Sequence, residues 1–380
     1  MIPKDEITRI MEKYYHTREL TIGVIGTHSA LEVCRGAKDE DFKTIVICQK
    51  NREKTYSKYF VSRERFGKKV GIVDEVLVLE KFSEIAREEV QEELRRKSTL
   101  LVPHRGLSVY VGYETIENLL KIPIFGNRYL LKIEERGVDL NQYKLLEKAG
   151  IPYPRILRSP EEIDGPVIVK VSEAARQYER GFFIVSSAKE FEEKSAALIE
   201  KKLIAREALE KAVIEELVVG APFNFNFFYS PLDGEIELLG IDMRRQTNID
   251  GLLRLPATQQ LEVLKYVVVR NIEVGHVACT IRESLLERAF ELAEKFVKTT
   301  QETHPPGVIG PFALQGIVTP GPPHEEIVVY DVSVRVPGSP GTKFTPYSEN
   351  LWGFPISVGR RIAFEIREAL RQDKLEKILT

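Results

Sequence analysis

Three short runs between residues 144 and 220 decide the fold: KLLEKAGIPYP (144–154), PVIVK (166–170) and IEELVVG (214–220). The first run reads as the end of a helix, because its apolar residues recur at helical spacing and Gly150 supplies a stop. The other two are short and rich in β-branched residues, which is typical of strands. A further strand and a helix lie between them, over residues 181–203. The pattern predicts a small α+β unit.

Strand and helix patterns alternate upstream of this unit. Four apolar runs have the length of strands: TIGVIG (21–26), TIVICQ (44–49), EVLVLE (75–80) and TLLVPH (99–104). A helical pattern follows the first run, and a charged amphipathic helix separates the last two. Because strands that alternate with helices pair in parallel, the sequence predicts a parallel, doubly wound sheet here.

The remainder of the chain is richer in antiparallel strand signals. Residues 222–245 read as a hairpin that turns at Asp233 and Gly234, residues 327–336 as a late strand, and residues 360–379 as a closing amphipathic helix. We therefore expect three parts: an N-terminal α/β domain (1–125), a small subdomain (126–212) and a C-terminal subdomain (213–380).

Composition excludes several classes of protein. The formal net charge of the 380 residues is −2, so the chain lacks the basic footprint of a nucleic-acid-binding protein. No run of eighteen apolar residues exists, and the N-terminus reads as a charged amphipathic helix, so we expect neither a membrane span nor a signal peptide. Only three cysteines occur, without metal-ligand spacing, which favours the reducing cytoplasm.

Two common enzyme classes also fit poorly. VIGTHSAL follows a strand, but it lacks the G-x-G-x-x-G pattern and no acidic residue ends the next strand, which argues against a dehydrogenase. The six histidines are scattered with no pair spaced by four, which argues against a metal hydrolase.

Two loops fall at the carboxyl ends of predicted parallel strands, where such sheets bind ligands. They are Gly26-Thr27-His28-Ser29 and Pro103-His104-Arg105-Gly106, and each sets a histidine beside small residues. The first loop precedes a helix whose free N–H groups could receive a phosphate. The alternative, that Gly26 and Thr27 only form a turn and a cap, stays open.

Lys170 and the pair Glu215 and Glu216 are candidates for a nucleotide site. A lysine at the end of an apolar strand can reach phosphates as a point charge. The backbone beside the two glutamates suits the edge of an adenine. Equally, a lysine at a strand end is often a solvated edge residue, and paired glutamates are often surface charge.

Gln315, in GPFALQGIV, and Asp331, in VVYDVSV, interrupt two apolar strands. A buried polar side chain without a partner destabilises by roughly 1–3 kcal/mol, so these two residues point to a ligand. Both offer oxygen atoms, which Mg²⁺ prefers together with phosphate oxygens. Arg335 lies four residues after Asp331 and shares its face by the period of two.

The order of these motifs resembles that of ATP-grasp proteins, and nearly the whole chain resembles the archaeal formate-dependent synthetases of 5-formaminoimidazole-4-carboxamide ribonucleotide (FAICAR). NIDGLLRLPATQQLE and FGNR are the most specific matches, and composition does not explain them. The matching segments are GTHSAL (26–31), LLVPH (100–104), PIFGNR (123–128), NIDGLLRLPATQQLE (248–262), TIRESLL (280–286), GPFALQG (310–316) and RRIAFEIREAL (360–370).

The resemblance implies an α/β ATP-grasp fold with two α+β ATP-grasp subdomains, and a ligase of purine (IMP) biosynthesis that uses ATP and Mg²⁺. It would join formate to AICAR, the aminoimidazole carboxamide ribonucleotide, through formyl phosphate, and the family commonly forms homo-oligomers. The resemblance also implies roles for single residues. They are Lys144, Lys170, Glu216, Leu217 and Val218 for ATP; Gln315 and Asp331 for magnesium; His28, Ser29, Gly106 and Asn248 for AICAR; and Arg335 and Arg282 for catalysis.

Several ligand positions depart from the family pattern. SEAARQYERGFF (172–183) stands where the family carries a glycine-rich lid, and Asp331 stands where the family resembles Glu. His104-Arg105-Gly106 replaces an HGS loop, Arg245-Gln246-Thr247-Asn248 replaces RYESN, and GSPGTKFTPYS (338–348) replaces a GGTN-like segment. Two alternatives therefore stay open: an ATP-grasp ligase for another carboxylate and amine, or a catalytically impaired paralogue that binds nucleotide or an oligomeric partner.

Overall fold

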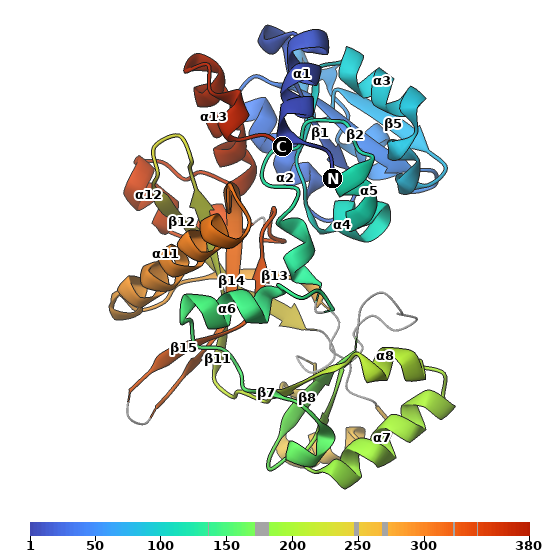
Figure 1. Ribbon diagram of the computed structural model, residues 1–380, viewed down its shortest axis with the longest axis vertical. Coiled ribbons are helices and arrows are strands. Elements are labelled where there is room, and N and C mark those ends of the chain that lie inside the picture. The colour runs from blue at the N-terminus through green and yellow to red at the C-terminus, as the bar shows by residue number, and fades with distance from the viewer. Residues whose placement is uncertain (136, 172–181, 247–250, 268–272, 322–323, 340) are drawn as a thin grey trace.

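Three sheets follow one another along the long axis of the molecule in the computed structural model (Figure 1). A parallel sheet lies at one end, a five-stranded sheet in the middle and a small four-stranded sheet at the other end. The structure describes residues 1–135, 137–171, 182–246, 251–267, 273–321, 324–339 and 341–380.

The N-terminal sheet is parallel, as the alternating pattern predicts. Its order is β5-β2-β1-β6, from strands β1 (Thr21–Ile25), β2 (Lys43–Gln49), β5 (Glu75–Leu79) and β6 (Thr99–Leu101). The chain winds outward from β1 to β5 and then crosses back to place β6 on the other side of β1. Ligands bind at such a reversal, beyond the carboxyl ends of the two central strands.

Helices cover both faces of this sheet, which explains why its strands are apolar runs without alternation. Ile22 and Val24 pack on the face covered by α2 (Ala30–Asp39) and α13 (Val358–Arg371). The opposite face packs against α3 (Glu88–Arg96), α4 (Arg105–Val111) and α5 (Tyr113–Asn118), and α1 (Lys4–Tyr14) precedes β1.

Helix α13 returns from the far end of the sequence to complete this N-terminal unit. It crosses α2 so closely that a Cβ atom on Gly36 would lie 2.0 Å from the backbone nitrogen of Arg360. The expected closing helix over 360–379 is shorter, since α13 ends at Arg371 and a separate turn of 3-10 helix covers Leu375–Lys377.

The FGNR segment has a structural role. Asn127 Nδ2 donates to the carbonyl oxygens of His304 and Gly307, at 3.0 and 2.9 Å. Arg128 is fully buried, and its guanidinium donates to the carbonyl oxygens of Ile116, Leu120, Ile122 and Thr380. Buried carbonyl groups need hydrogen-bond donors, and Arg128 supplies donors to carbonyl groups from two segments. It thereby connects residue 380 to residues 116–122 around α5.

The small sheet is antiparallel, with the order β7-β10-β8-β9. Helices α7 (Ala188–Glu200) and α8 (Arg206–Glu210) accompany it, and α6 (Gln142–Ala149) ends at Gly150 in the left-handed conformation, as predicted. The strands are β7 (Ile156–Leu157), β8 (Val167–Lys170), β9 (Phe182–Val185) and β10 (Val213–Glu216).

The middle sheet is antiparallel in the order β13-β12-β11-β14-β15. It contains the predicted hairpin and the strands of Gln315 and Asp331. Helix α11 (Leu286–Thr303), which the sequence analysis did not assign, covers one face. The strands are β11 (Ala221–Tyr229), β12 (Ile236–Gln246), β13 (Glu273–Cys279), β14 (Gly310–Thr319) and β15 (Glu326–Ser333).

Alternation along β11 gives this sheet one apolar and one polar face. Phe225 and Phe227 pack into the core that includes Phe296 of α11. Asn224 and Asn226 therefore point to the opposite face, because successive side chains of a strand alternate.

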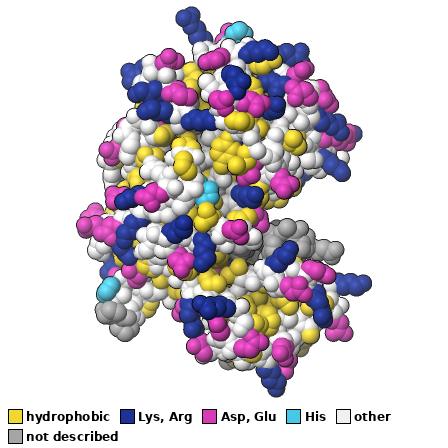
Figure 2. Space-filling model, viewed as in Figure 1, with side chains coloured by type: hydrophobic (Ala, Val, Ile, Leu, Met, Phe, Trp, Pro, Cys, Tyr) yellow, Lys and Arg dark blue, Asp and Glu magenta, His cyan; other side chains and the backbone are white. Residues whose placement is uncertain are grey.

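The remaining elements are short: the hairpin of β3 (Arg63–Arg65) and β4 (Lys68–Val70), and the helices α10 (Ala257–Val263) and α12 (Tyr347–Trp352). Among the described residues, no helix is both long and apolar enough to cross a membrane. Acidic and basic side chains are interspersed over the face in Figure 2.

Candidate active site

A cleft of about 670 Å³ lies where the three sheets meet. The polar face of the middle sheet forms one wall, β8 and β10 form another, and the loops after β1 and β15 close one end. Eight of the residues to which the family resemblance gives a role line it: His28, Lys170, Glu216, Leu217, Val218, Gln315, Asp331 and Arg335.

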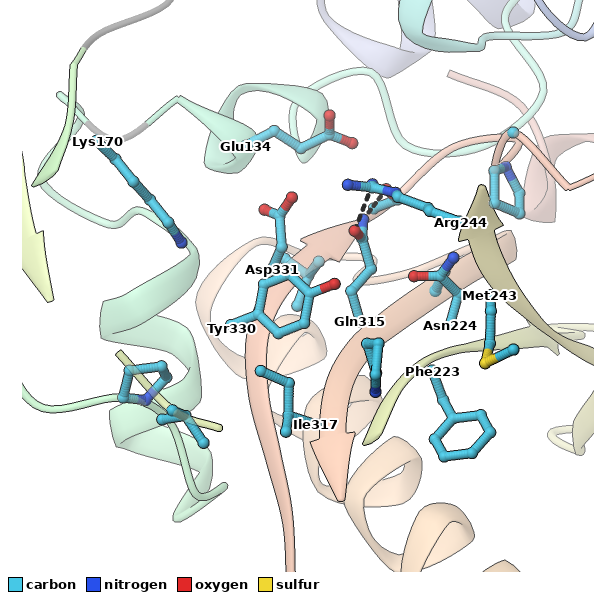
Figure 3. A pocket seen from close by; sticks show the side chains of 18 of the residues that line it. Glu134, Lys170, Phe223, Asn224, Met243, Arg244, Gln315, Ile317, Tyr330 and Asp331 are labelled. Carbon is cyan, nitrogen blue, oxygen red and sulfur yellow. Dashed lines mark hydrogen bonds between the residues drawn. The ribbon is translucent and has the colours of Figure 1, made fainter. Parts of the chain in front are cut away.

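A row of polar residues crosses the wall of the cleft that the middle sheet forms. Asp242 of β12 lies opposite Asn224 of β11, Asn224 opposite Gln315 of β14, and Gln315 opposite Asp331 of β15. Residues opposite one another in an antiparallel sheet point to the same face, so these side chains belong to one surface. Figure 3 shows Asn224, Gln315 and Asp331 projecting into the same space.

Gln315 and Asp331 fit the donor set of a magnesium ion, which takes one or two carboxylate or amide oxygens and completes its shell with phosphate and water. The Gln315 side chain accepts a hydrogen bond from Arg244 Nη2 and donates to Ser333 Oγ, at 3.4 Å. The Asp331 carboxylate lies on the side of Lys170 and Glu134 (Figure 3).

Lys170 is held by two partners on the opposite wall. Its Nζ forms an ion pair with Glu215 and lies 3.4 Å from Tyr143 Oη, which donates to Glu215 Oε2 at 2.7 Å. Strand β8 lies between β10 and β9, so Lys170 is not a solvated residue at a sheet edge. The ammonium also lies over the Tyr330 ring, 5.6 Å from its centroid.

The segment after β10 lines an apolar slot of the cleft. Leu217 N donates to Pro166 O at 3.0 Å, which fixes the start of this segment beside β8. Apolar side chains from both walls face it, among them Ile168, Ile184 and Ile317. An aromatic base fits such a slot, because apolar side chains cover its faces and backbone groups meet its edge.

Two arginines share one carboxylate at the end of the cleft. Arg105 Nη1 and Arg335 Nη2 donate to the same oxygen of Glu134, at 3.2 and 3.1 Å. Burial alone would lower the pKa of Arg105, but the nearby carboxylates, Glu134 first, raise it above its usual value. Both guanidinium groups line the cleft, where they can meet an anionic ligand.

The loops at the reversal point of the parallel sheet meet here as predicted. His28 lines the cleft, and its Nδ1 lies 2.9 Å from the hydroxyl of the buried Ser29. Gly338 packs against the His28 ring, since a Cβ atom at 338 would lie 2.1 Å from Cε1. Gly106 packs equally closely on Thr27, so a serine side chain does not fit there in this arrangement.

His104 joins the two loops from within the core. It is fully buried; its Nε2 lies 2.8 Å from Ile25 O, and its Nδ1 accepts from Gly106 N–H at 3.0 Å. Burial lowers the pKa of His104 to about 4. The ring is therefore neutral at pH 7 and acts as a fixed spacer between the loops.

Acidification is expected to destabilise the protein through His104. The pKa rises from about 4 in the folded state to 6.5 in the unfolded state, so between these values only the unfolded state binds the proton. The free energy of unfolding therefore decreases as the pH is lowered from 6.5 to 4, by roughly 3 kcal/mol in total. Urea unfolding at pH 7 and pH 4.5 measures this loss, which should be smaller in His104→Gln; equal losses in both proteins would contradict the assignment.

Comparison with known proteins identifies the family. Curated archaeal proteins named "5-formaminoimidazole-4-carboxamide-1-(beta)-D-ribofuranosyl 5'-monophosphate synthetase" match the chain over its whole length. The protein of Methanopyrus kandleri is 40% identical over 384 residues and that of Methanocaldococcus jannaschii 42% identical over 386 residues, with 100% of both chains covered in each case. The chain belongs to this synthetase family.

Two family models also match, one described as "Protein of unknown function (DUF1246)" over residues 22–157 and one as "Domain of unknown function (DUF1297)" over residues 190–380. A crystal structure of "an IMP biosynthesis protein PurP from Thermococcus kodakaraensis" aligns with a TM-score of 0.70 at 30% identity, covering 94% of this chain and 100% of that one. An L-amino acid ligase from Bacillus licheniformis aligns at 13% identity over 94% of this chain and 76% of that one, with a TM-score of 0.56. The expected ATP-grasp fold and synthetase family are confirmed.

Not every residue singled out from the sequence lies in the cleft. Lys144 is exposed on α6 and pairs with Glu147, and Arg282 is exposed and pairs with Glu325. Asn248 and residues 172–181 of the lid lie outside the described residues. The roles assigned to single site residues stay predictions. The boundaries of the three domains also stay predictions.

The sequence analysis missed a group of polar residues at the cleft, in which Asn224, Asn226 and His276 line the wall and the buried Asp242 lies behind them. A signal for it existed. In FNFNFF the two asparagines alternate with phenylalanine, so they share one face of a strand whose other face is apolar.

Proposed function

We propose that the protein is a FAICAR synthetase, an ATP- and formate-dependent ligase that converts AICAR to FAICAR in IMP biosynthesis. The observation that carries the proposal is one continuous cleft with two chemically different ends. Lys170, Gln315 and Asp331 offer phosphate and cation ligands at one end, and the loop of His28 offers a binding site at the other. The full-length similarity to the synthetases supports the substrate assignment.

We assign the ends of the cleft as the resemblance implies. Lys170 and Lys144 would contact ATP phosphates, and the segment of Glu216, Leu217 and Val218 would hold the adenine. His28, Ser29, Gly106 and Asn248 would hold AICAR, with Arg335 and Arg282 as catalytic arginines. Lys144 and Arg282 are ion-paired outside the cleft in this structure, so these two roles require their segments to move.

The proposed reaction has two transfers. A formate oxygen attacks the γ-phosphorus of ATP and ADP leaves; the 5-amino nitrogen of AICAR then attacks the formyl carbon and phosphate leaves. Catalysis of this type depends mostly on positioning and charge neutralisation. The guanidinium groups of Arg105 and Arg335, oriented by Glu134, would hold anionic reactants. Mg²⁺ between Gln315 and Asp331 would neutralise phosphate charge when bound.

The impaired paralogue remains the second candidate because of the lid. Glu173 and Glu179 bring negative charge where the family pattern has glycine-rich backbone, and a carboxylate near a triphosphate is unfavourable. Against this candidate, polar residues stand opposite one another across four neighbouring strands, from Asp242 to Asp331.

The deciding experiment measures phosphate release by the purified protein with ATP, Mg²⁺, formate and AICAR, omitting each in turn. Release that requires all four, with FAICAR as product, is the expected result. Binding of ATP and AICAR without release would instead favour the paralogue, and release with another carboxylate and amine would favour a different ligase. The homo-oligomer and the cytoplasmic location stay predictions.

A further inference from the structure

A second polar group lines the cleft on the side of β12 and β13, and the assignments above give it no role. Asp242 is its centre and has no exposed surface. Its carboxylate accepts hydrogen bonds from Asn224 Nδ2 at 2.8 Å and from Asn226 Nδ2 at 2.7 Å, and it lies 2.5 Å from His276 Nδ1. We call these four residues the Asp242 cluster.

The cluster is built to keep a carboxylate ionised inside the protein. Burial alone would raise the pKa of Asp242, yet the hydrogen bonds from His276, Asn224 and Asn226 outweigh burial and lower it. The backbone groups of these strands already pair in the sheet, so strand pairing does not require the three side-chain donors. Their hydrogen bonds instead stabilise the charged carboxylate. The buried Oδ1 of Asn226 has no hydrogen-bond partner among the described residues, which leaves an acceptor beside the cleft.

A short chain of contacts connects His276 to the loop of His28. The hydroxyl of Ser339 lies 3.5 Å from His276 Nδ1, and the preceding residue, Gly338, packs directly on the His28 ring. His28, Gly338, Ser339 and His276 all line the cleft. His276 therefore lies near the loop of His28, where AICAR is expected.

The contact with Asp242 also fixes which nitrogen of His276 can accept a proton. When a carboxylate holds one ring nitrogen, that nitrogen carries the hydrogen and the other carries the lone pair. Here Asp242 holds Nδ1, so Nε2 is the basic atom. A histidine held in this way is oriented to accept a proton, and the carboxylate stabilises the imidazolium that results.

We propose that His276 accepts the proton of the AICAR 5-amino group during formyl transfer, and that Asp242 positions its imidazole. The proposal rests on the proposed function. As the amine attacks, the new C–N bond uses the nitrogen lone pair, and the C–O bond to phosphate breaks with its electrons leaving on phosphate. The proton passes from the amine to Nε2 of His276 and then to solvent. An amine conjugated with the imidazole ring is a weak nucleophile, so removing its proton helps the attack.

The test separates proton removal from activation of formate. His276→Gln keeps an amide that can donate to Asp242, so the cluster can still fold. We expect FAICAR formation by this variant to fall roughly 10²–10⁴-fold. Hydroxylamine attacks acyl phosphates without a base, so formation of formyl hydroxamate from ATP, formate and hydroxylamine should stay within about threefold of wild type.

Asp242→Asn and a chemical rescue complete the design. Asp242→Asn is also expected to lower FAICAR formation strongly, with the AICAR KM nearly unchanged, because asparagine no longer holds the His276 tautomer whose lone pair is on Nε2. His276→Gly should recover FAICAR formation when imidazole is added. His16→Gln, at an exposed histidine of the N-terminal unit, is the matched control and should behave as wild type.

Two results would overturn the proposal. One is wild-type FAICAR formation in His276→Gln; the other is an equal loss of FAICAR and hydroxamate, which would show that His276 supports the fold or ATP binding. Absence of FAICAR formation by the wild-type protein is a different failure, because it removes the proposed function itself.

Discussion

Asp331→Asn is expected to lower FAICAR formation roughly 10²–10³-fold, the range seen when one group that stabilises transition-state charge is removed. Asp331 of β15 lies directly opposite Gln315 of the neighbouring strand β14, on the side of the cleft that faces Lys170. The substitution keeps the volume and removes the charge. If Asp331 holds magnesium, the Mg²⁺ concentration for half-maximal rate should also rise, which a purely structural role would not cause.

Two variants serve as controls for Asp331→Asn. Asp331→Glu restores the residue that the family pattern carries and should keep most of the activity. Glu326→Gln lies on the same strand, where its side chain pairs with Arg288 outside the cleft, and should change the rate less than twofold. Activity of Asp331→Asn within about threefold of wild type, at unchanged Mg²⁺ dependence, would remove Asp331 from the metal site.

Arg361→Leu is expected to lower the free energy of unfolding by roughly 3–5 kcal/mol, since removing one partner leaves buried charge uncompensated. Arg361 is 1% exposed. Its guanidinium donates to Glu237 of β12, with contacts of 2.6 to 3.0 Å, and to Glu365 of α13 at 2.8 Å. It also lies 4.2 Å from the centroid of the Phe228 ring. Urea unfolding followed by circular dichroism measures the loss.

Arg371→Leu is the matched control on the same helix. Arg371 is exposed and pairs with Glu368 three residues earlier, an arrangement that contributes at most a few tenths of a kcal/mol. Its substitution should change the free energy of unfolding by less than about 0.5 kcal/mol. A similar, small effect of both substitutions would show that Glu237 and Glu365 find other partners or become protonated.

Much of the architecture follows from periodicity in the sequence. The parallel sheet was predictable because its apolar runs alternate with amphipathic helices, and the end of α6 because Gly150 can adopt the left-handed conformation. Gln315 and Asp331 were recognisable individually, because each is a polar residue inside an apolar strand. Their position opposite one another depends on the register, which shifts between Gln315 and Gly316 and has no sequence signal.

The features that the sequence did not predict are those assembled from distant segments. The Asp242 cluster draws on three strands, β11, β12 and β13, and no local pattern places His276 beside Asp242. Likewise, FGNR stood out as a motif without an explanation, because Arg128 meets carbonyl groups from residues 116–122 and from residue 380. Lys170 was assigned to phosphate, but its partner Tyr143 comes from α6.

The docking of α13 on α2 sets an order of events during synthesis. Residues 21–101 leave the ribosome long before residues 358–371, yet one face of their sheet is covered by both helices. Until α13 arrives, apolar side chains such as Ile22 and Val24 lack part of their cover. The N-terminal unit is therefore completed only after residues 358–371 have been synthesised, and a fragment that stops before residue 358 should bind chaperones or aggregate.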